Sequence, residues 1–587
     1  MTKPTTVVSF SNSLDIDGNP VWNDISSYVL SVSINRGKSS DLDSYSSGTA
    51  SISLNNRSRA FEPNYASSPY YGLIEPFGKV RIVSGGYTEF VGVIDTWSYG
   101  YSENGVFATA LIQANDNLSV LAKNVLTENT FTAELSGSRV RNILYGTDVY
   151  FTDATCIDTG TRTITDDAVA EGASVLDYLQ KIGANDGALF YARRDGILAY
   201  QDSTLATATG LPFTRKNLVR DSNLAIVPIA DPFGTWSGPG VRSTAWAYQG
   251  THSWTNNASA DISYFKYDAA LYQTNTPYYV SFYLRSSIAQ NVTVYAYMSD
   301  SSAGDDPDSN VTQSISMGAG EVRRIDLGVV QSKIPVDGLI FGTRLDSGVP
   351  ATGTIFMDCA LVEQTIKLQT YFDGNSTTAA PSGQTYSFSF EGTANNSTSV
   401  FTTTVNSLVD FSVVTSITDS NYSGIKFNDV SMVYASEKLY NQITVNGNAL
   451  ESAAGDTASQ SQYGLKEYAV TDAILDNQYD NDTLASYLLS LYRVPDYRAE
   501  SVLINLHNLG TSDQNTILAM DMLSQINLKF LPGNTGTALS GNYLVIGINQ
   551  SITTEEHMVE LRVTSLDNYG FILDHPALGI LDTNRLV

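Results

Sequence analysis

Alternating apolar and polar residues mark short strands in the first part of the chain. In the stretch ASISL, Ala50, Ile52 and Leu54 are separated by serines, and a side-chain period of two is typical of a half-buried strand. The stretch KVRIVSGGYTEFVGVIDTWSY, residues 79–99, predicts a hairpin with a Gly-Gly turn. We therefore expect a β-barrel domain over residues 1–122.

The second arm of that hairpin is apolar on both faces. Its apolar residues are Phe90, Val91, Val93, Ile94 and Trp97. A strand with two apolar faces is covered twice, once by its own core and once by a neighbour. This pattern suits a barrel that assembles with other barrels.

Helical periodicity begins after residue 122. Ser174 precedes a stripe of apolar residues as a helix cap, and the stripe consists of Val175, Leu176, Leu179 and Ile182. The stretch LFYARRDGILAY, which follows, predicts two strands around an Asp-Gly turn. These patterns predict an α+β domain over residues 123–210.

Residues 211–398, which we call the insert, contain no convincing amphipathic helix. Short strands such as YYVSFYLRSS, NVTVYAYMS and GTIFMDCALVEQ alternate with turns rich in Gly, Ser, Asp and Asn. Regular short strands between turn signals are typical of a β-sandwich. The length of the insert suits a jelly roll followed by a trailing β segment.

A mixed pattern resumes after the insert. SEKLYNQITVNG predicts a strand, NDTLASYLLSLYRV predicts a helix with Asn481 or Asp482 as its N-cap, and YLVIGINQSITTEEHMVELRVTSL predicts a closing hairpin. We expect a second β-barrel domain over residues 399–475 and an α+β domain over residues 476–587. The fold class is therefore mainly β with minor α+β, and the insert interrupts a host that continues on either side.

Charge and composition narrow the function. The chain has 33 basic and 60 acidic residues, a net charge of −27, which repels phosphate backbones and argues against nucleic-acid binding. No run of residues is long and apolar enough to predict a membrane span. The two cysteines, Cys156 and Cys359, lie far apart outside any Cys-x-x-Cys motif, so we expect isolated buried thiols.

Catalytic and metal signatures are missing from the sequence. The four histidines have no metal-ligand spacing, and neither a Gly-x-Ser-x-Gly elbow nor a phosphate-binding glycine loop occurs. DIDGN, residues 15–19, departs from a calcium loop because its glycine stands at the fourth position instead of the sixth. We expect no enzyme activity, no catalytic residue, no cofactor and no metal, although the many carboxylates leave a glycosidase pair open.

The strongest chemical signal is a group of aromatic residues early in the insert. These candidate carbohydrate-binding residues are Trp236, Trp246, Tyr248 and Trp254. Aromatic rings stack on the C–H faces of sugars, while neighbouring amides and carboxylates bond the hydroxyls. The alternative for any one of these rings is burial in the sandwich core.

Both ends of the chain resemble a family of tailed-phage minor tail proteins, or tail hubs. Residues 24–82 contain an RG turn, a GTA strand running into Leu-x-Asn-x-x-Arg-x-Phe-x-Pro, and then SPYYG. The C-terminal stretch LDNYGFILDHPALGILDTNRLV is similar to the end of that family. The resemblance covers residues 1–210 and about 410–587.

The insert resembles jelly-roll carbohydrate-binding modules. NLVRDSNL at its start and GTIFMDCALVEQ near its end carry this resemblance, although the start departs from the usual Asn-Pro-x-Phe-Glu. In relatives, an aspartate equivalent to Asp358 sometimes helps to bind calcium. The resemblance implies host-surface polysaccharide as a partner.

Together the two resemblances imply a structural hub at the tail tip of a virion, assembled in the host cytoplasm. They imply a homotrimer that joins the tail tube or distal tail protein to tail-tip or fibre proteins in the baseplate region, with an outward-facing module for host adhesion. Candidate subunit-interface residues are Arg57, Arg59, Phe61, Tyr70 and Tyr71, because Tyr and Arg are enriched at interfaces. The alternatives are an envelope-glycan hydrolase with an appended binding module, and a purely structural hub whose insert binds nothing.

Overall fold

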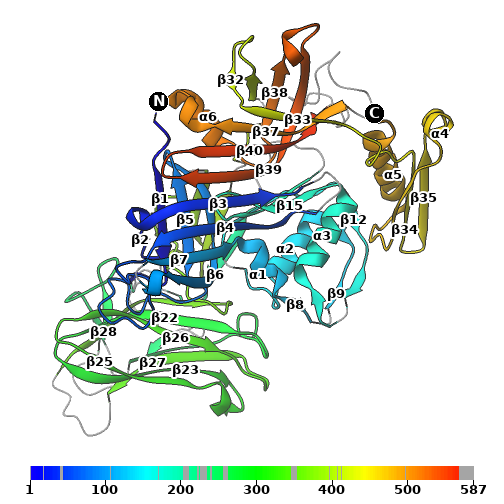
Figure 1. The fold of residues 1–587 in the computed structure, drawn as a ribbon. Coiled ribbons are helices and arrows are strands. Elements are labelled where there is room, and N and C mark those ends of the chain that lie inside the picture. Colours follow the sequence, from blue (N-terminus) through cyan, green and yellow to red (C-terminus); the bar gives the residue numbers. More distant parts are fainter. Residues whose placement is uncertain are drawn as a thin grey trace.

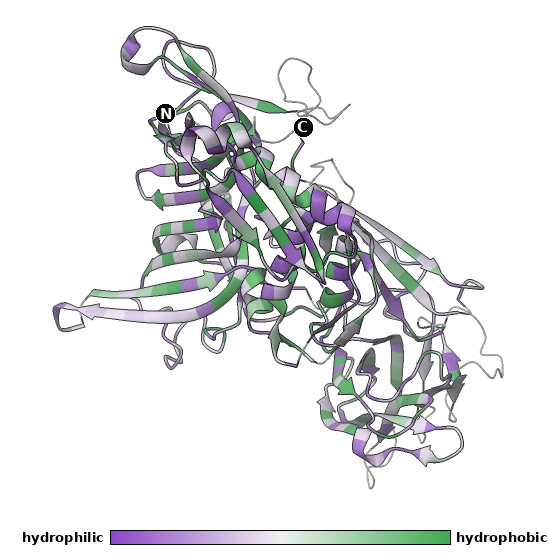
Figure 2. Ribbon diagram, turned by 90° about the vertical axis from the view of Figure 1, so that its right-hand side faces the viewer, coloured by the Kyte–Doolittle hydropathy of each residue, from purple (hydrophilic) through white to green (hydrophobic). Residues whose placement is uncertain are grey.

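The computed structural model describes most of the chain, and every structural statement below concerns the described residues. These are residues 2–16, 19–39, 44–105, 107–127, 129–151, 153–169, 171–202, 211–220, 222, 224, 235–237, 241–255, 262–345, 353–381, 383–395, 397–405, 408–410, 413–495 and 497–566. The C-terminal motif after residue 566 and the Asp17-Gly18 turn therefore lie outside the described residues. The fold is mainly β, and hydrophobic and hydrophilic residues alternate along many of its strands (Figure 2).

The N-terminal strands form a sheet in the order β2-β1-β5-β6-β7-β4-β3. Their bounds are β1 (Thr6–Ser11), β2 (Asn23–Asp24), β3 (Val29–Gly37), β4 (Ser46–Asn55), β5 (Lys79–Ser84), β6 (Tyr87–Ser102) and β7 (Phe107–Asn115). Ala50, Ile52 and Leu54 of β4 are buried in its core, as their alternation predicts. The β5–β6 hairpin turns at Gly85 and Gly86, whose positive φ angles of 57° and 89° favour glycine.

A second group of strands comes from the C-terminal part of the chain. It consists of β31 (Val414–Thr418), β32 (Ile425–Lys426), β33 (Asp429–Tyr434), β37 (Tyr497–Asn505), β38 (Gln525–Phe530), β39 (Leu539–Thr553) and β40 (His557–Ser565). β3 pairs with β39 from Ser31–Thr553 to Gly37–Gly547, which unites both groups in one 14-stranded sheet. At the end of this pairing a Cβ on Gly37 would lie only 2.5 Å from the Cα of Gly547, so the close approach requires glycine.

The prediction of β-barrel domains over residues 1–122 and 399–475 is therefore corrected in one respect. No closed barrel forms within the described residues. The physical reason is that β3, the edge strand of the N-terminal group, pairs with the later half of β39, whose first half pairs with β38. The N-terminal sheet therefore continues into the C-terminal group instead of closing on itself. Figure 1 shows the resulting arrangement, with the N-terminal strands between the C-terminal strands and the insert. We call the described parts of residues 2–202 and 413–566 the frame.

The first α+β unit packs beside the N-terminal strands. Its helices are α1 (Asn117–Ala122), α2 (Ser136–Leu144) and α3 (Val175–Asp186), and its strands are β8 (Val125–Leu126), β9 (Asn129–Phe131), β10 (Glu134–Leu135), β11 (Thr155–Ile157), β12 (Thr163–Ile164), β13 (Asp167–Val169), β14 (Ala173–Ser174), β15 (Leu189–Ala192) and β16 (Leu198–Gln201). The Ser174 side chain caps α3 by accepting a hydrogen bond from the Asp177 amide. Gly187 ends the helix at a φ of 70°, as the sequence pattern predicts.

The second α+β unit lies between β33 and β37, which pair with each other. It contains β34 (Gln442–Gly447), β35 (Leu450–Gly455), α4 (Thr457–Tyr463), β36 (Glu467–Val470) and α5 (Gln478–Tyr492), while α6 (Thr511–Ala519) follows β37. The boundary expected at residue 475 thus falls inside this unit. The predicted α5 cap is wrong: Asn477 caps the helix by accepting from the Asp480 amide, and Asn481 is buried within it.

The insert is a two-sheet sandwich, as predicted (Figure 1). One sheet contains β18 (Thr235–Ser237), β21 (Ile262–Tyr267), β23 (Gln290–Asp300), β24 (Gly304–Asp305), β25 (Val311–Met317) and β27 (Gly338–Leu345). The other contains β19 (Val241–Ser243), β20 (Ser253–Thr255), β22 (Tyr278–Ser286), β26 (Val322–Val330) and β28 (Ile355–Glu363). The trailing segment forms a separate sheet, which we call the trailing sheet, from β17 (Phe213–Asn217), β29 (Gln384–Phe390) and β30 (Ser399–Val405).

Buried polar side chains connect three parts of the frame. Arg36 of β3 donates to Asp521 over 2.7 Å, and the other oxygen of Asp521 accepts the Arg194 amide over 3.0 Å. Nearby, Gln550 of β39 donates to Glu89 over 2.6 Å and lies 2.9 Å from Nε2 of His557. These contacts join the N-terminal strands, the first α+β unit and the C-terminal strands.

We expect His557 to make the frame sensitive to acid. Burial lowers the pKa of His557 to about 4 from an ordinary value of 6.5. As the pH falls through this window, the unfolded chain takes up a proton that the folded chain does not, so the free energy of unfolding falls by at most about 1.4 kcal/mol per pH unit. His557→Gln should remove this slope while keeping a donor toward Gln550.

The measurement is urea unfolding of both proteins between pH 4 and pH 7. Burial raises the pKa of Glu89 to about 7, which gives a slope of the opposite sign, but Glu89 is present in both proteins and its effect cancels in the difference. Parallel pH profiles of wild type and variant would contradict the assignment to His557.

Candidate carbohydrate-binding site

The structure separates Trp254 from Trp246 and Tyr248, which the sequence groups together. Trp254 of β20 is only 6% exposed and belongs to the sandwich core. Trp246 lies half-buried in the loop between β19 and β20, with its ring 6.1 Å from that of Phe356. Tyr248 follows in the same loop, and the side chain of Trp236 lies outside the described part of the chain. Trp246 and Tyr248 are thus the two candidates whose side chains are described and partly exposed.

Asp358 fixes the loop that carries Tyr248. One oxygen of its buried carboxylate accepts the amides of Tyr248 and Gln249 over 2.7 and 3.2 Å, and the other accepts the Cys359 amide over 2.8 Å. Cys359 has a φ of 50°, and the pairing of β22 with β28 shifts register here, so a bulge aims the carboxylate at the loop. Burial raises the pKa of Asp358 to about 7.

Tyr248 lies beside a pocket between the sandwich and the trailing sheet. Its ring stacks on that of Tyr283, with centroids 3.7 Å apart and planes at 14°. The pocket has a volume of about 400 Å³, within the usual range for small-ligand sites. It is lined by Asn19, Arg215, Tyr248, Gln249, Thr370, Tyr371, Phe372, Thr378, Tyr386, Phe388 and Phe401.

Arg215 of β17 holds the base of the insert together. Its guanidinium donates to both carboxylate oxygens of Glu363 over 2.9 and 2.6 Å, and both side chains are buried. It also donates to the Thr370 carbonyl over 2.9 Å and lies over the rings of Phe372 and Phe401. This one side chain therefore ties the trailing sheet to β28 of the sandwich and to the segment that follows β28.

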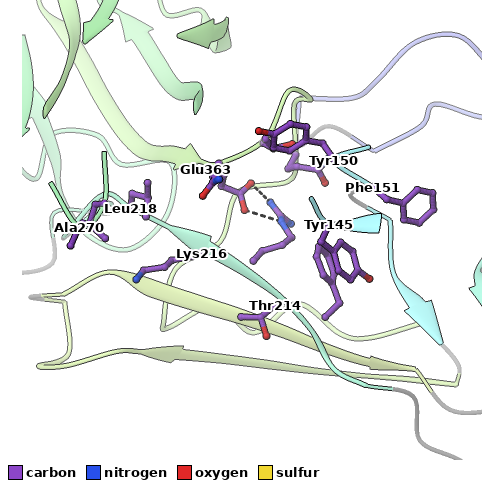
Figure 3. Close-up of a pocket in the computed structure, with 14 residues that line it drawn as sticks. Tyr145, Tyr150, Phe151, Thr214, Lys216, Leu218, Ala270 and Glu363 are labelled. Atoms are coloured by element: carbon purple, nitrogen blue, oxygen red, sulfur yellow. Dashed lines mark hydrogen bonds and ion pairs between the residues drawn. The ribbon is translucent and has the colours of Figure 1, made fainter. Parts of the chain in front are cut away.

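A second pocket, of about 360 Å³, lies where the insert meets the first α+β unit. Figure 3 shows Tyr145, Tyr150 and Phe151 of the frame on one side of it and Lys216 and Glu363 of the insert on the other. The Tyr145 ring stacks on Phe213 of β17 at 4.4 Å, so aromatic packing seats the insert on the frame.

The candidate interface residues divide into two groups. Phe61 is fully buried in the N-terminal core, and Tyr70 stacks on it at 5.4 Å, so both pack on their own chain. Arg57 is exposed and lies over the Phe107 ring, while Arg59 is exposed and pairs with Glu62. Tyr71 is 57% exposed. Arg57, Arg59 and Tyr71 therefore have surface available for a neighbour.

Metal and membrane features are absent from the described residues. No group of three or more His, Cys, Asp or Glu side chains there could hold a metal ion. No described helix is both long and apolar enough to cross a bilayer. Cys156 and Cys359 are buried thiols, as predicted.

Comparison with known proteins gives likenesses to solved structures. The chain is similar to the tail protein from Neisseria meningitidis MC58, at 7% identity and a TM-score of 0.44, over 96% of this chain and 98% of that chain. It is similar to the 43 kDa tail protein of prophage MuSo2 from Shewanella oneidensis, at 8% identity and a TM-score of 0.41, over 97% and 98%. The CBM22-1 xylan-binding domain from Paenibacillus barcinonensis Xyn10C matches 28% of this chain and 99% of its own, at 11% identity and a TM-score of 0.19. No family model and no curated protein matches the sequence.

Proposed function

We propose that the chain is a structural hub of a phage tail, which links the tail tube to the tail tip, and that the insert faces outward and binds host-surface glycan. The sequence motifs at both ends of the chain support the first part. The aromatic residues and the sandwich fold of the insert support the second.

The observation that carries the proposal is the way in which the insert is attached. The chain leaves the frame along β17 and returns along β30, and these strands pair with each other from Phe213–Thr403 to Asn217–Ser399. The segments before and after the insert also complete one common sheet through β3 and β39. The frame is therefore a continuous structure, and the sandwich is an addition that can serve a separate function.

Removing the insert from the phage tests the proposal. Because Asn217 and Ser399 are opposite each other, residues 218–398 can be replaced by an Asn-Gly turn that closes β17 and β30 into a hairpin. We expect particles that assemble normally and no longer adsorb to host cells, measured by electron microscopy and adsorption assays. Normal adsorption would contradict a binding role for the insert. Hydrolysis of host envelope by the purified chain would favour the glycan-hydrolase alternative.

The hub proposal also predicts a subunit interface at the exposed candidates. We expect the triple variant Arg57→Ala, Arg59→Ala, Tyr71→Ala to weaken or abolish a homotrimer, because interface aromatics and arginines contribute most of the binding energy. Analytical ultracentrifugation of purified protein, or of tails, measures the change. Tyr479→Ala is the matched control, because Tyr479 is 77% exposed on the second α+β unit. A trimer that survives the triple variant would remove these residues from the interface.

A further inference from the structure

We propose that the 400 Å³ pocket beside Tyr248 binds a short, uncharged saccharide, and that the frame completes the pocket. This rests on the proposed function of the insert as a glycan-binding module. The proposed site lies away from the tryptophans, where the sandwich, the trailing sheet and the loop before β2 meet. Four observations support it.

The first observation is an aromatic wall on the trailing sheet. Tyr386 and Phe388 alternate along β29 with the exposed Ser387 and share one half-buried face. Phe401 of β30 stands beside them, stacked on Phe388 with centroids 4.8 Å apart and planes at 10°. Rings that keep part of their surface in a pocket offer flat apolar faces to the C–H bonds of a sugar ring.

The second observation is the set of polar groups around that wall. Asn19, Gln249, Thr370 and Thr378 all line the pocket and carry amides or hydroxyls. Such groups both donate and accept hydrogen bonds, which is what a ring of hydroxyl groups requires. Apolar walls with a few polar groups are typical of small-ligand sites.

The third observation concerns charge. Among the described residues that line the pocket, Arg215 is the one that carries a charge, and its guanidinium is already paired with both oxygens of Glu363. An acidic sugar would compete with Glu363 for this cation and bring the two carboxylates together. The pocket therefore favours a neutral hexose or pentose unit over a uronic or sialic acid.

The fourth observation is that the frame contributes to the pocket. Asn19 comes from the loop before β2, and its backbone amide donates to the Asp15 carboxylate over 2.8 Å. Tyr283, which stacks beneath Tyr248, donates its hydroxyl to the Ile16 carbonyl over 2.9 Å. Because the same tyrosine supports Tyr248 and contacts this loop, the pocket depends on the seating of the insert on the frame.

The test uses the full-length protein and two panels of oligosaccharides. One panel holds neutral xylo-, gluco- and galacto-oligosaccharides, and the other holds sialylated and uronic-acid oligosaccharides. We expect wild type to bind members of the neutral panel in calorimetry. Thr378→Trp, a substitution at an exposed position that fills the pocket, should abolish binding. Asn19→Ala and Gln249→Ala should each weaken it by about three- to tenfold, the effect of one lost hydrogen bond.

Two controls separate this inference from the proposal on which it rests. Gln273→Ala replaces glutamine by alanine, as Gln249→Ala does, but at an exposed position of the sandwich outside the pocket. Trp246→Ala removes the half-exposed tryptophan. Gln273→Ala should bind as wild type does, and Trp246→Ala should lose less affinity than Thr378→Trp. Loss of binding in Trp246→Ala with unchanged affinity in Thr378→Trp would overturn the pocket and keep a glycan-binding insert. Binding of the acidic panel alone would overturn the ligand class, and binding of neither panel would contradict the proposed function itself.

Discussion

Asp521→Ala is expected to lower the free energy of unfolding by about 3–5 kcal/mol, the cost of leaving one partner of a buried ion pair alone. Asp521 and Arg36 are each 2% exposed, and their atoms lie 2.7 Å apart. The substitution also removes the acceptor for the Arg194 amide. Because Arg36 belongs to β3 and Arg194 to the first α+β unit, we expect the frame to loosen where its parts meet. Urea unfolding followed by circular dichroism measures the loss.

The matched control is Asp95→Ala. Asp95 pairs with Lys123 over 3.1 Å, but the two side chains are 45% and 60% exposed, so water screens their attraction. We expect a change between about 0 and 1 kcal/mol. Equal effects of the two substitutions would mean that the Arg36–Asp521 pair does not connect the parts of the frame.

Arg215→Ala should have an effect of similar size, about 3–5 kcal/mol, confined to the base of the insert. It leaves Glu363 buried without its cation and removes a donor from the Thr370 carbonyl. The segment between β28 and β29, residues 364–383, should then open more often. Limited proteolysis should cut the variant there at low protease concentrations that leave the wild type intact.

Two variants check the cause of that effect. Arg323→Ala breaks an ion pair with Glu321 whose side chains are 43% and 33% exposed, and it should leave the proteolysis pattern unchanged. Arg215→Met combined with Glu363→Met removes both charges and should recover most of the lost stability, because no buried charge is left alone. If the double variant is no more stable than Arg215→Ala, the ion pair is not the reason for the loss.

Local features of the fold could be predicted from the sequence because nearby residues determine them. The α3 helix lies between Ser174 and Gly187, whose capping roles depend only on the adjacent turn. The N-cap of α5 is harder to predict, because the stretch DNQYDND offers several residues able to cap a helix. The structure uses Asn477, so the helix starts at Gln478, before Asn481 and Asp482, the caps expected from the sequence.

Long-range features could not be predicted in the same way. The pairing of β3 with β39 joins strands from opposite ends of the chain, and no local pattern reveals such a partner. Phe61 illustrates the same limit: a loop phenylalanine among arginines and prolines resembles an interface residue, yet it fills the N-terminal core. Val91 of the two-sided strand β6 lies against Gly196 of the same chain, so one of its faces is covered without a second subunit.

The candidate site was predicted in part. The sequence pointed to the loop of Trp246 and Tyr248, and Tyr248 does line a pocket. It did not point to Tyr386 and Phe388, although the alternation in YSFSF is visible in the trailing segment. Alternation predicts a strand with one apolar face, but only the tertiary arrangement decides whether that face is covered or lines a cavity.

The pairing of β17 with β30 has a mechanical consequence. Five residue pairs connect the two strands side by side, and both reach the frame at the same end. The paired strands β17 and β30 therefore form a stiff connection between the frame and the sandwich. A module on a flexible Gly/Ser-rich linker would instead move through a wide volume. In a tail with several copies, these stiff connections would hold the sandwiches at fixed distances from one another. Under the proposed function, a host surface with sparse receptors would engage one copy and a dense surface several, so that receptor density decides how firmly the particle holds.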